Sequence, residues 1–285
     1  MQEYPPPSTV WIDGRLTDGR SAAVPALDHS LLTGFGVFET LAVRAARPIA
    51  PSRHLARLQS SAATLGIAPP PEQSIQDAIR AVLDSFPLPD ARLRITLTAG
   101  DSEGIPFLVS GPPRLIVAAS RLPARRDTAI LATAPWQKHA DGALVGIKST
   151  SYGDHVRCVR HARQLGADEA LILNTNGHIC EGGSSNIWWV RDRVVHTPPV
   201  KSGCLPGITR GLVLEICRRD GLHIRETEAH PATLLAADEV FLTSSLRDVQ
   251  GVSQIDTSNL PPAPGEITTL LLNSLTDWLD ADPDP

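Results

Sequence analysis

Gly146-Ile147-Lys148-Ser149-Thr150-Ser151-Tyr152 is the stretch from which the fold and the chemistry of this chain can best be predicted. The chain has 26 basic residues, but only three of them are lysines: Lys138, Lys148 and Lys201. Arginine keeps its proton near neutral pH, whereas a partly buried lysine can act as a neutral amine. Lys148 stands among apolar neighbours in a strand-like run, which favours a desolvated, nucleophilic amine. Taken alone, the stretch fits better a lysine at a strand end with its ammonium in water.

Composition restricts the class of protein. A chain of 285 residues with 42% apolar and 20% charged residues can form one large or two smaller globular domains. A net charge of -5 and a pI near 6.0 argue against a nucleic-acid-binding protein. Four scattered cysteines without a Cys-x-x-Cys pattern indicate reduced thiols in a cytoplasmic protein, with no zinc site. No apolar run reaches the ~18 residues of a membrane span, so we expect no membrane association.

Hydrophobic periodicity and turn signals predict alternating helices and strands. Asp13-Gly14 is typical of a hairpin turn after a short strand, and Ser52 is expected to cap a helix. The predicted elements are strands at 10–12, 37–43, 92–98, 115–119, 128–134, 170–173, 187–190 and 240–242, and helices at about 52–65, 72–86, 154–165, 208–221 and 267–279. The Pro- and Arg-containing stretch near residue 120 predicts a smaller domain at 1–120, a linker at 121–127 and a larger domain at 128–285.

Several short motifs allow a functional and a purely structural interpretation. Arg57 lies one turn after Arg53 on a predicted helix, as expected of a solvated basic face or of an anion contact. Gly34-x-Gly36 lacks the third glycine of a dinucleotide-binding fingerprint. The predicted helix start at 207–209 suits a phosphate, but ordinary helix starts are common and phosphate sites are few. Glu181, beside two glycines and between strands, is either an acid in a site or part of a surface bulge.

Together these motifs resemble one family. They are Asp28-His29, Gly36-Val37-Phe38-Glu39-Thr40, His54-Leu55-Ala56-Arg57-Leu58, Lys148-Ser149-Thr150-Ser151-Tyr152, Gly166-Ala167-Asp168-Glu169-Ala170, Glu181-Gly182-Gly183-Ser184-Ser185-Asn186-Ile187 and Leu205-Pro206-Gly207-Ile208-Thr209-Arg210. In this order and spacing they resemble the class IV aminotransferases, the fold type IV enzymes that use pyridoxal 5'-phosphate (PLP). The resemblance implies an α/β (α+β) fold of two domains with the cofactor in the cleft between them. It also implies a homodimer in the cytoplasm.

The resemblance also implies roles for individual residues. Lys148 would hold PLP as a Schiff base and move the substrate's Cα proton, and Glu181 would keep the pyridine nitrogen protonated. Leu205 would pack on the ring and Tyr152 would reach the ring hydroxyl. The remaining expected cofactor residues are Arg57, Ser185, Asn186, Gly207, Ile208, Thr209, Ser244 and Ser245, and the expected substrate residues are Phe38 and Thr40.

The reaction is predicted less sharply than the family. Residues 28–40 look most like aminodeoxychorismate lyases, which release 4-aminobenzoate and pyruvate for folate synthesis, and that is the first expectation. The alternative is a transaminase acting on D-amino acids, (R)-amines or branched-chain amino acids. Against a D-amino acid enzyme, the loop after Thr98 lacks the Arg-x-His pair that would bind a substrate carboxylate. Against the lyase, Lys148 is followed by Ser149 where some lyases carry histidine.

Two interpretations from other classes remain. A metal-dependent hydrolase could use His155 and His161, but a spacing of six does not place both on one helix face. A binding protein without catalysis would need neither the amine of Lys148 nor the carboxylate of Glu181. We therefore expect a PLP enzyme acting on a small amine substrate, with no metal site.

Overall fold

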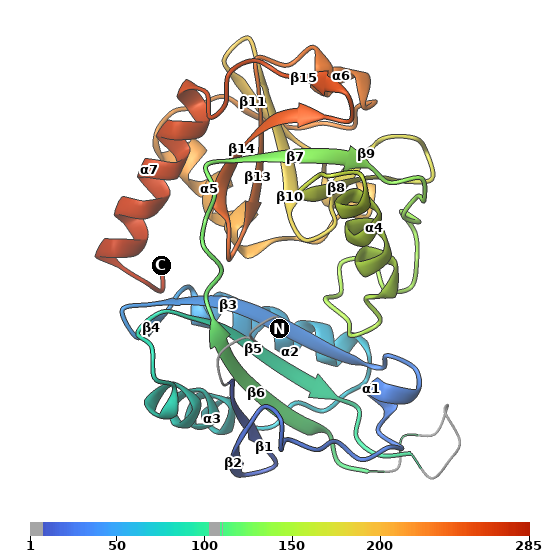
Figure 1. Ribbon diagram of the computed structural model, residues 1–285, viewed down its shortest axis with the longest axis vertical. Coiled ribbons are helices and arrows are strands. Elements are labelled where there is room, and N and C mark those ends of the chain that lie inside the picture. Colours follow the sequence, from blue (N-terminus) through green and yellow to red (C-terminus); the bar gives the residue numbers. More distant parts are fainter. Residues whose placement is uncertain (1–7, 103–108, 110) are drawn as a thin grey trace. The chain divides into compact units, whose positions relative to one another are not determined.

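The structure is a computed structural model that describes residues 8–102, 109 and 111–285. It consists of helices and two β-sheets, as the α/β prediction requires (Figure 1). The chain divides into two compact units, and each is described by itself below. Unit 1 contains Met1–Pro123, Ile147–Tyr152 and Pro283–Pro285, and unit 2 contains Ala124–Gly146 and Gly153–Asp282. Lys148 therefore belongs to unit 1, which differs from the expectation of a single boundary near residue 120.

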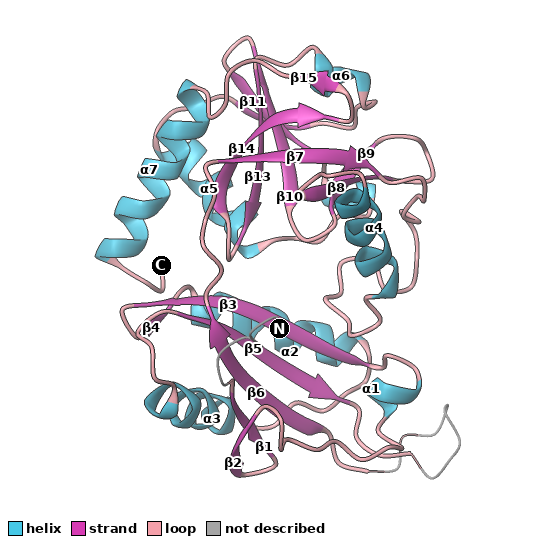
Figure 2. Ribbon diagram, in the orientation of Figure 1, coloured by secondary structure: helices cyan, strands magenta, loops and turns pink. Residues whose placement is uncertain are grey.

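Unit 1 is built on a six-stranded antiparallel sheet in the order β2-β1-β6-β5-β3-β4 (Figure 2). Its elements are β1 Thr9–Ile12, β2 Arg15–Asp18, α1 His29–Leu32, β3 Gly36–Arg44, β4 Arg47–Pro48, α2 Pro51–Thr64, α3 Glu72–Ser85, β5 Ala91–Thr98 and β6 Arg114–Arg121. The predicted hairpin is present, because Asp13 and Gly14 both adopt positive φ between β1 and β2. The strict alternation in β5 sends Leu93, Ile95 and Leu97 to one face and leaves polar side chains on the other.

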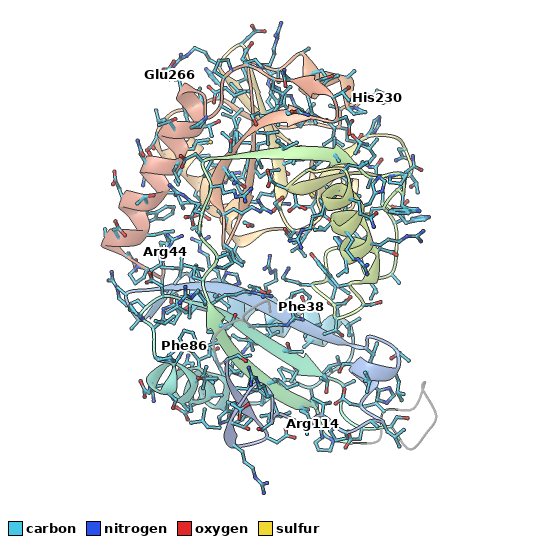
Figure 3. All side chains as sticks on the ribbon, viewed as in Figure 1. Phe38, Arg44, Phe86, Arg114, His230 and Glu266 are labelled. Atoms are coloured by element: carbon cyan, nitrogen blue, oxygen red, sulfur yellow. The ribbon has the colours of Figure 1, made fainter. Side chains whose placement is uncertain are left out.

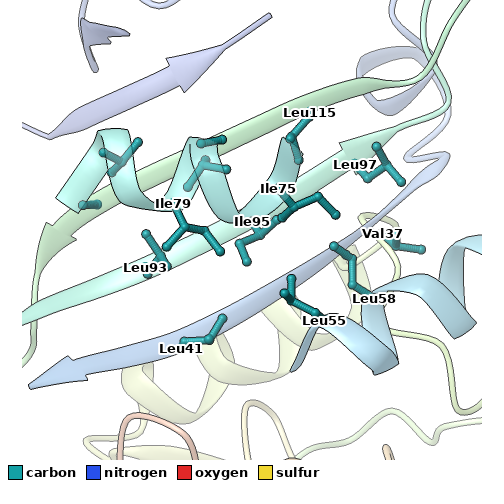
Figure 4. Packing of buried hydrophobic residues seen from close by; sticks show 14 of the residues in the cluster. Val37, Leu41, Leu55, Leu58, Ile75, Ile79, Leu93, Ile95, Leu97 and Leu115 are labelled. Atoms are coloured by element: carbon teal, nitrogen blue, oxygen red, sulfur yellow. The ribbon is translucent and has the colours of Figure 1, made fainter. Parts of the chain in front are cut away.

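Helices α2 and α3 cover one face of this sheet. Figure 4 shows Leu55 and Leu58 of α2 and Ile75 and Ile79 of α3 directed at the aliphatic side chains of β3, β5 and β6. Each helix presents its apolar residues at three- and four-residue spacing, so one stripe is buried while the rest faces water. Unit 1 thus has a core of its own, and the opposite face of the sheet is left for other contacts.

The start of α2 differs from the sequence prediction. The helix begins at Pro51, so Ser52 is its second residue, and the N-cap is Ala50 in the left-handed region. The hydrogen-bonding role expected of Ser52 passes to Asp284, whose carboxylate accepts hydrogen bonds from the Ser52 backbone N–H at 3.0 Å and from its hydroxyl at 2.5 Å. A residue 232 positions away caps the helix, which local sequence could not indicate.

Unit 2 holds a nine-stranded mixed sheet in the order β12-β11-β10-β13-β14-β7-β8-β9, with β15 pairing to β14. Its elements are β7 Thr128–Thr133, α4 Gly153–Gln164, β8 Glu169–Leu173, β9 Ile179–Gly182, β10 Asn186–Arg191, β11 Val194–Thr197, a short 3₁₀ turn Val200–Ser202, α5 Ile208–Arg219, β12 Ile224–Glu226, α6 Ala232–Leu235, β13 Glu239–Ser244, β14 Asp248–Ile255, β15 Ser258–Asn259 and α7 Glu266–Ala281. Two apolar clusters line this sheet, one of them packed against α4 through Cys158 and Ala162. Within the described ranges, no helix is both long enough and apolar enough to cross a membrane.

Candidate functional site

Two glycines allow the lysine-bearing segment to lie against an edge of the unit 1 sheet. The Phe38 backbone N–H donates to the Lys148 carbonyl at 2.9 Å, and the Thr150 N–H donates to the Gly36 carbonyl at 2.8 Å. A Cβ at Gly36 would lie 2.8 Å from a backbone oxygen of β5, and a Cβ at Gly34 would lie 2.9 Å from the Ser151 Cα. The Gly34-x-Gly36 pair is therefore a docking strip for this segment, because no side chain fits there.

Lys148 ends among aromatic rings of unit 1. Its Nζ lies 4.5 Å from the Phe38 ring centroid and 5.3 Å from that of Tyr152, and the two rings meet edge to face at 5.3 Å. Figure 3 labels Phe38 on β3, the strand on which the predicted substrate residue Thr40 also lies. The structure thus brings together Phe38, Tyr152 and Lys148. Thr40 faces the same side of the sheet as Phe38, two residues further along β3.

The other two lysines are held in ion pairs. Lys138 Nζ lies 2.5 Å from Glu181 Oε1, and Lys201 Nζ lies 3.3 Å from Glu228 with its own side chain 74% exposed. Burial lowers the pKa of Lys138, but the charge of Glu181 outweighs it and raises the pKa overall. Lys138 is therefore held as an ammonium, which makes it a poor nucleophile and leaves Lys148 as the candidate amine.

Arg57 has a carboxylate partner, Glu39, that was not predicted. Its Nε donates to Glu39 Oε1 at 2.7 Å and its Nη2 donates to Oε2 at 2.8 Å, while His54 Nδ1 lies 2.6 Å from the same Oε2. Burial raises the pKa of Glu39, but the positive charge and hydrogen bonds of Arg57 lower it to about 2. Burial lowers the pKa of His54, and this outweighs the hydrogen bond with Glu39 that raises it. The sequence signal was available, since both α2 residues lie one turn apart on the helix that packs on β3.

Two further arginines were not recognised as site candidates. Arg92 and Arg94 lie on the face of β5 that points away from the core. In the ladder with β3 they pair with Ala42 and Thr40 respectively. The Arg94 guanidinium carbon lies 3.7 Å from the Phe38 ring centroid, so one ring contacts both Arg94 and Lys148. Burial and the charge of Arg92 lower the pKa of Arg94 to about 10. Among the described residues neither arginine has an acidic partner, and the buried Arg92 Nε donates to no acceptor.

In unit 2, Glu181 is a buried carboxylate surrounded by donors. Oε1 accepts from Lys138 and from His155 Nε2 at 3.2 Å, and Oε2 accepts from the Leu205 backbone N–H at 2.8 Å. Burial raises its pKa, but the hydrogen bond from His155 and the charge of Lys138 lower it to about 2. Glu181 is consequently an anion at every physiological pH, as its predicted partnership with a protonated ring nitrogen requires.

The residues after Glu181 converge on the start of α5. Asn186 Nδ2 donates to the Leu205 carbonyl at 2.8 Å, and a Cβ at Gly207 would lie 2.1 Å from Asn186 Oδ1. Ser185 Oγ is buried and has no hydrogen-bond partner among the described residues. Its hydroxyl is therefore able to form a hydrogen bond with a bound molecule. Asn186, Leu205 and Gly207, all predicted cofactor residues, therefore form one cluster.

The predicted phosphate residues of unit 2 lie at two element ends. Gly207 is the N-cap of α5, so Ile208 and Thr209 present the first backbone N–H groups of a twelve-residue helix. Ser244 ends β13 opposite Asp248, followed by Ser245, and both serines are half-buried. Asn186 pairs with Thr243 across β10 and β13, which places its neighbours beside the end that carries the two serines.

A metal centre is not supported. In the parts of the chain that the structure describes, no group of histidines, cysteines and acids has the arrangement to hold a metal ion. His155 hydrogen-bonds Glu181, whereas His161 packs edge to face on Trp136, so the two histidine rings have different contacts.

Comparisons with known proteins give consistent matches over nearly the whole chain. The family described as amino-transferase class IV matches residues 36–255. The branched-chain-amino-acid aminotransferase of Pseudomonas aeruginosa is 30% identical over 261 residues, covering 87% of this chain and 84% of the relative. The aminodeoxychorismate lyase of Bacillus subtilis is 26% identical over 274 residues, covering 92% of each. Among solved structures, the branched-chain amino acid aminotransferase of T.th. complexed with N-(5'-phosphopyridoxyl)-L-glutamate has a TM-score of 0.89 at 26% identity, covering 98% of this chain and 96% of that one.

Proposed function

We propose that this chain, which belongs to the class IV aminotransferase family, transfers the amino group of an amino acid to a 2-oxo acid. The family assignment and the fold type IV expected from the sequence are both confirmed by the comparisons. The cofactor is PLP, as in the family and in the structural relative that carries a phosphopyridoxyl group. The reaction expected first, the lyase, is less well supported than its alternative, because the similar solved structure above is a branched-chain aminotransferase.

The environment of Lys148 is the observation that carries the proposal. It contacts two aromatic rings, while Lys138 and Lys201 are committed to carboxylates. PLP supplies an electron sink when its ring nitrogen is protonated. We assign Lys148 to binding the cofactor's aldehyde carbon and to moving the Cα proton, and Glu181 to holding the ring nitrogen's proton.

The proposed phosphate site uses charge and backbone donors. The helix start at Ile208 and Thr209 supplies aligned N–H groups, and Ser244 and Ser245 supply hydroxyls. Arg57 supplies a guanidinium whose orientation is fixed by its two hydrogen bonds to Glu39. Within unit 2, the Ser185 hydroxyl, without a hydrogen-bond partner among the described residues, and the close packing of Asn186 on Leu205 and Gly207 support the assignment of these residues to one cofactor.

Arg92 and Arg94 favour a substrate that carries a carboxylate. Two half-buried guanidinium groups without an acidic partner among the described residues repel one another, and an anion would offset that repulsion. Because Arg94 and Lys148 contact the same Phe38 ring, a carboxylate held by Arg94 would belong to a molecule near the reactive amine. This supports amino acids over (R)-amines that lack a carboxylate.

A lyase acting on aminodeoxychorismate remains the second candidate, since a lyase is similar over 92% of its length and that substrate also carries carboxylates. One assay separates the two functions. The enzyme with PLP is mixed with L-leucine, D-alanine or (R)-1-phenylethylamine and 2-oxoglutarate, and separately with aminodeoxychorismate alone. We expect a keto acid from an amino acid and little turnover of the amine. Release of 4-aminobenzoate and pyruvate, without keto acid from any amino donor, would establish the lyase instead.

We also propose a homodimer. Its support in the structure is the apolar surface of residues 27–32, where Leu27, Leu31 and Leu32 are each more than two-fifths exposed.

A further inference from the structure

Glu181 is fixed by two side chains that bracket Lys148 in the sequence. Lys138 stands ten residues before Lys148 and His155 stands seven residues after it, and both reach the same carboxylate oxygen, Glu181 Oε1. Their own backbones are well anchored. The Lys138 N–H donates to the Leu173 carbonyl at 2.8 Å, and His155 lies in the first turn of α4. The contact is therefore not a loose surface pair, since the side chains are 21% and 16% exposed.

The Glu181 carboxylate can accept more hydrogen bonds than the described residues supply. An ionised carboxylate has about four lone-pair positions. In the described part of the chain, Oε1 is occupied by Lys138 and His155, and Oε2 accepts one bond from Leu205. One position on Oε2 is left for a further donor.

The neighbouring titratable groups do not disturb this balance. Burial raises the pKa of Cys180 and of Cys204, so both thiols stay neutral beside the carboxylate. Glu181 is buried, and an anion without a partner would be costly there, so its charge depends on the Lys138 ammonium and on its hydrogen bonds with His155 and the Leu205 N–H.

We propose that Lys138 and His155 are positioning residues that hold Glu181 ionised and oriented, and that Lys138 sets how strongly the cofactor's ring nitrogen keeps its proton. The inference rests on the proposed role of Glu181. A neighbouring ammonium makes a carboxylate a weaker base, so the ring nitrogen paired with it loses its proton at lower pH than it would beside a lone carboxylate. Lys138 thereby limits the electron sink without contacting the substrate.

The test measures protonation rather than turnover. Protein loaded with ¹⁵N-labelled PLP is titrated by NMR, because the ¹⁵N shift of the ring nitrogen reports its proton. In Lys138→Met we expect the ring nitrogen to hold its proton to a pH about one unit higher, the size given by one charge at close range in a partly screened site. Lys138→Arg restores the cation and should return the wild-type shift. Lys201→Met is the matched control, because it removes the exposed lysine paired with Glu228 and should change nothing.

A double-mutant cycle shows whether Lys138 acts through Glu181. In the Glu181→Gln background the Lys138→Met shift should disappear, since no carboxylate remains to be tuned. An equal shift in both backgrounds, or none in Lys138→Met alone, would overturn the proposal.

A second readout uses the protein without cofactor. The ring of His155 shares Glu181 Oε1 with Lys138, so the ¹⁵N chemical shift of His155 Nε2, which reports that hydrogen bond, should change in both Lys138→Met and Glu181→Gln. If Lys138→Met does not fold, the Glu181→Gln arm on the cofactor-free protein still decides, and an unchanged His155 overturns the proposal. A protein that takes up no PLP but shows both His155 shifts would instead contradict the proposed function while the carboxylate clamp stands.

Discussion

Glu39 lies on the core side of β3 with none of its side chain exposed; the Arg57 guanidinium of α2 neutralises it, and His54 of the same helix hydrogen-bonds it. The motif Phe38-Glu39-Thr40 alternates across the sheet, so Phe38 and Thr40 face the lysine side while Glu39 turns toward the helices. These three residues of β3 thus contribute side chains to both faces of the sheet. Through Arg57, Glu39 also fixes the guanidinium proposed to hold the cofactor phosphate.

Replacing Glu39 should destabilise the protein in a pH-dependent way. In Glu39→Gln the nearly buried Arg57 loses the carboxylate charge that faces it, and breaking such a pair costs about 3–5 kcal/mol at neutral pH. The pKa of Glu39 is lowered to about 2, so its contribution is present above the usual carboxyl pKa and is lost as pH falls toward 2. The loss amounts to about 3 kcal/mol, since one pKa unit is about 1.4 kcal/mol.

Urea unfolding near pH 7 and near pH 2.5 measures this difference. The gap in unfolding free energy between wild type and Glu39→Gln should narrow in acid. Asp77→Asn is the control, because it removes an exposed carboxylate paired with Arg80 on α3, where an ion pair is worth little. A gap that is the same at both pH values would mean that Glu39 is not the titrating group.

The candidate site could be predicted where one residue type is required by the chemistry, and not where partners come from distant segments. Lys148 and Glu181 stood out because few lysines exist and an acid beside glycines is unusual. Lys138 and His155 are brought to Glu181 by the tertiary fold, and nothing in their local sequence marks them as its partners. Arg94 was passed over because arginines on an alternating strand are as often solvated as functional.

At the scale of elements, α2 depends on a cap from the other end of the sequence. The Asp284 carboxylate binds the Ser52 backbone N–H and hydroxyl, at the end of the helix where the macrodipole is positive. α2 also carries His54 and Arg57, so its first turn leads directly to the side chains that hold Glu39.

Removing that cap should weaken unit 1. We expect Asp284→Ala to cost about 0.5–2 kcal/mol, the usual loss for an N-terminal cap. Thermal unfolding followed by circular dichroism measures the change, with Asp280→Ala as control because Asp280 is an exposed acid on α7. Equal melting temperatures for wild type and Asp284→Ala would show that the Ala50 turn holds the helix start unaided.

The elements were predicted well where periodicity is strong and less well at their ends. α3 and α7 follow their apolar spacing closely, and β5 follows its alternation. The start of α2 was misassigned because Ser52 looks like a cap, whereas the true cap comes from Asp284. The six-residue segment 147–152 groups with unit 1 although it follows the predicted linker at 121–127, because its pairing with β3 is long-range.

At the scale of the whole molecule, unit 1 carries an exposed apolar surface that a monomer would leave in water. Leu31 is 66% exposed on α1, with Leu27 and Leu32 beside it in the sequence. Leucines that neighbour one another are more telling than scattered ones, because a continuous apolar patch marks a contact surface. This surface supports the proposed homodimer.

Charging the patch should break the dimer. In the double variant Leu31→Asp and Leu32→Asp, association would bury carboxylates without partners, so we expect the dissociation constant to rise at least about tenfold. Sedimentation velocity over a range of protein concentrations measures it. Leu165→Asp is the matched control, since Leu165 is 64% exposed after α4 in unit 2 and its replacement should leave the dimer intact. A wild-type chain that sediments as a monomer at micromolar concentration would refute the homodimer, and a double variant that dimerises like wild type would move the interface away from residues 27–32.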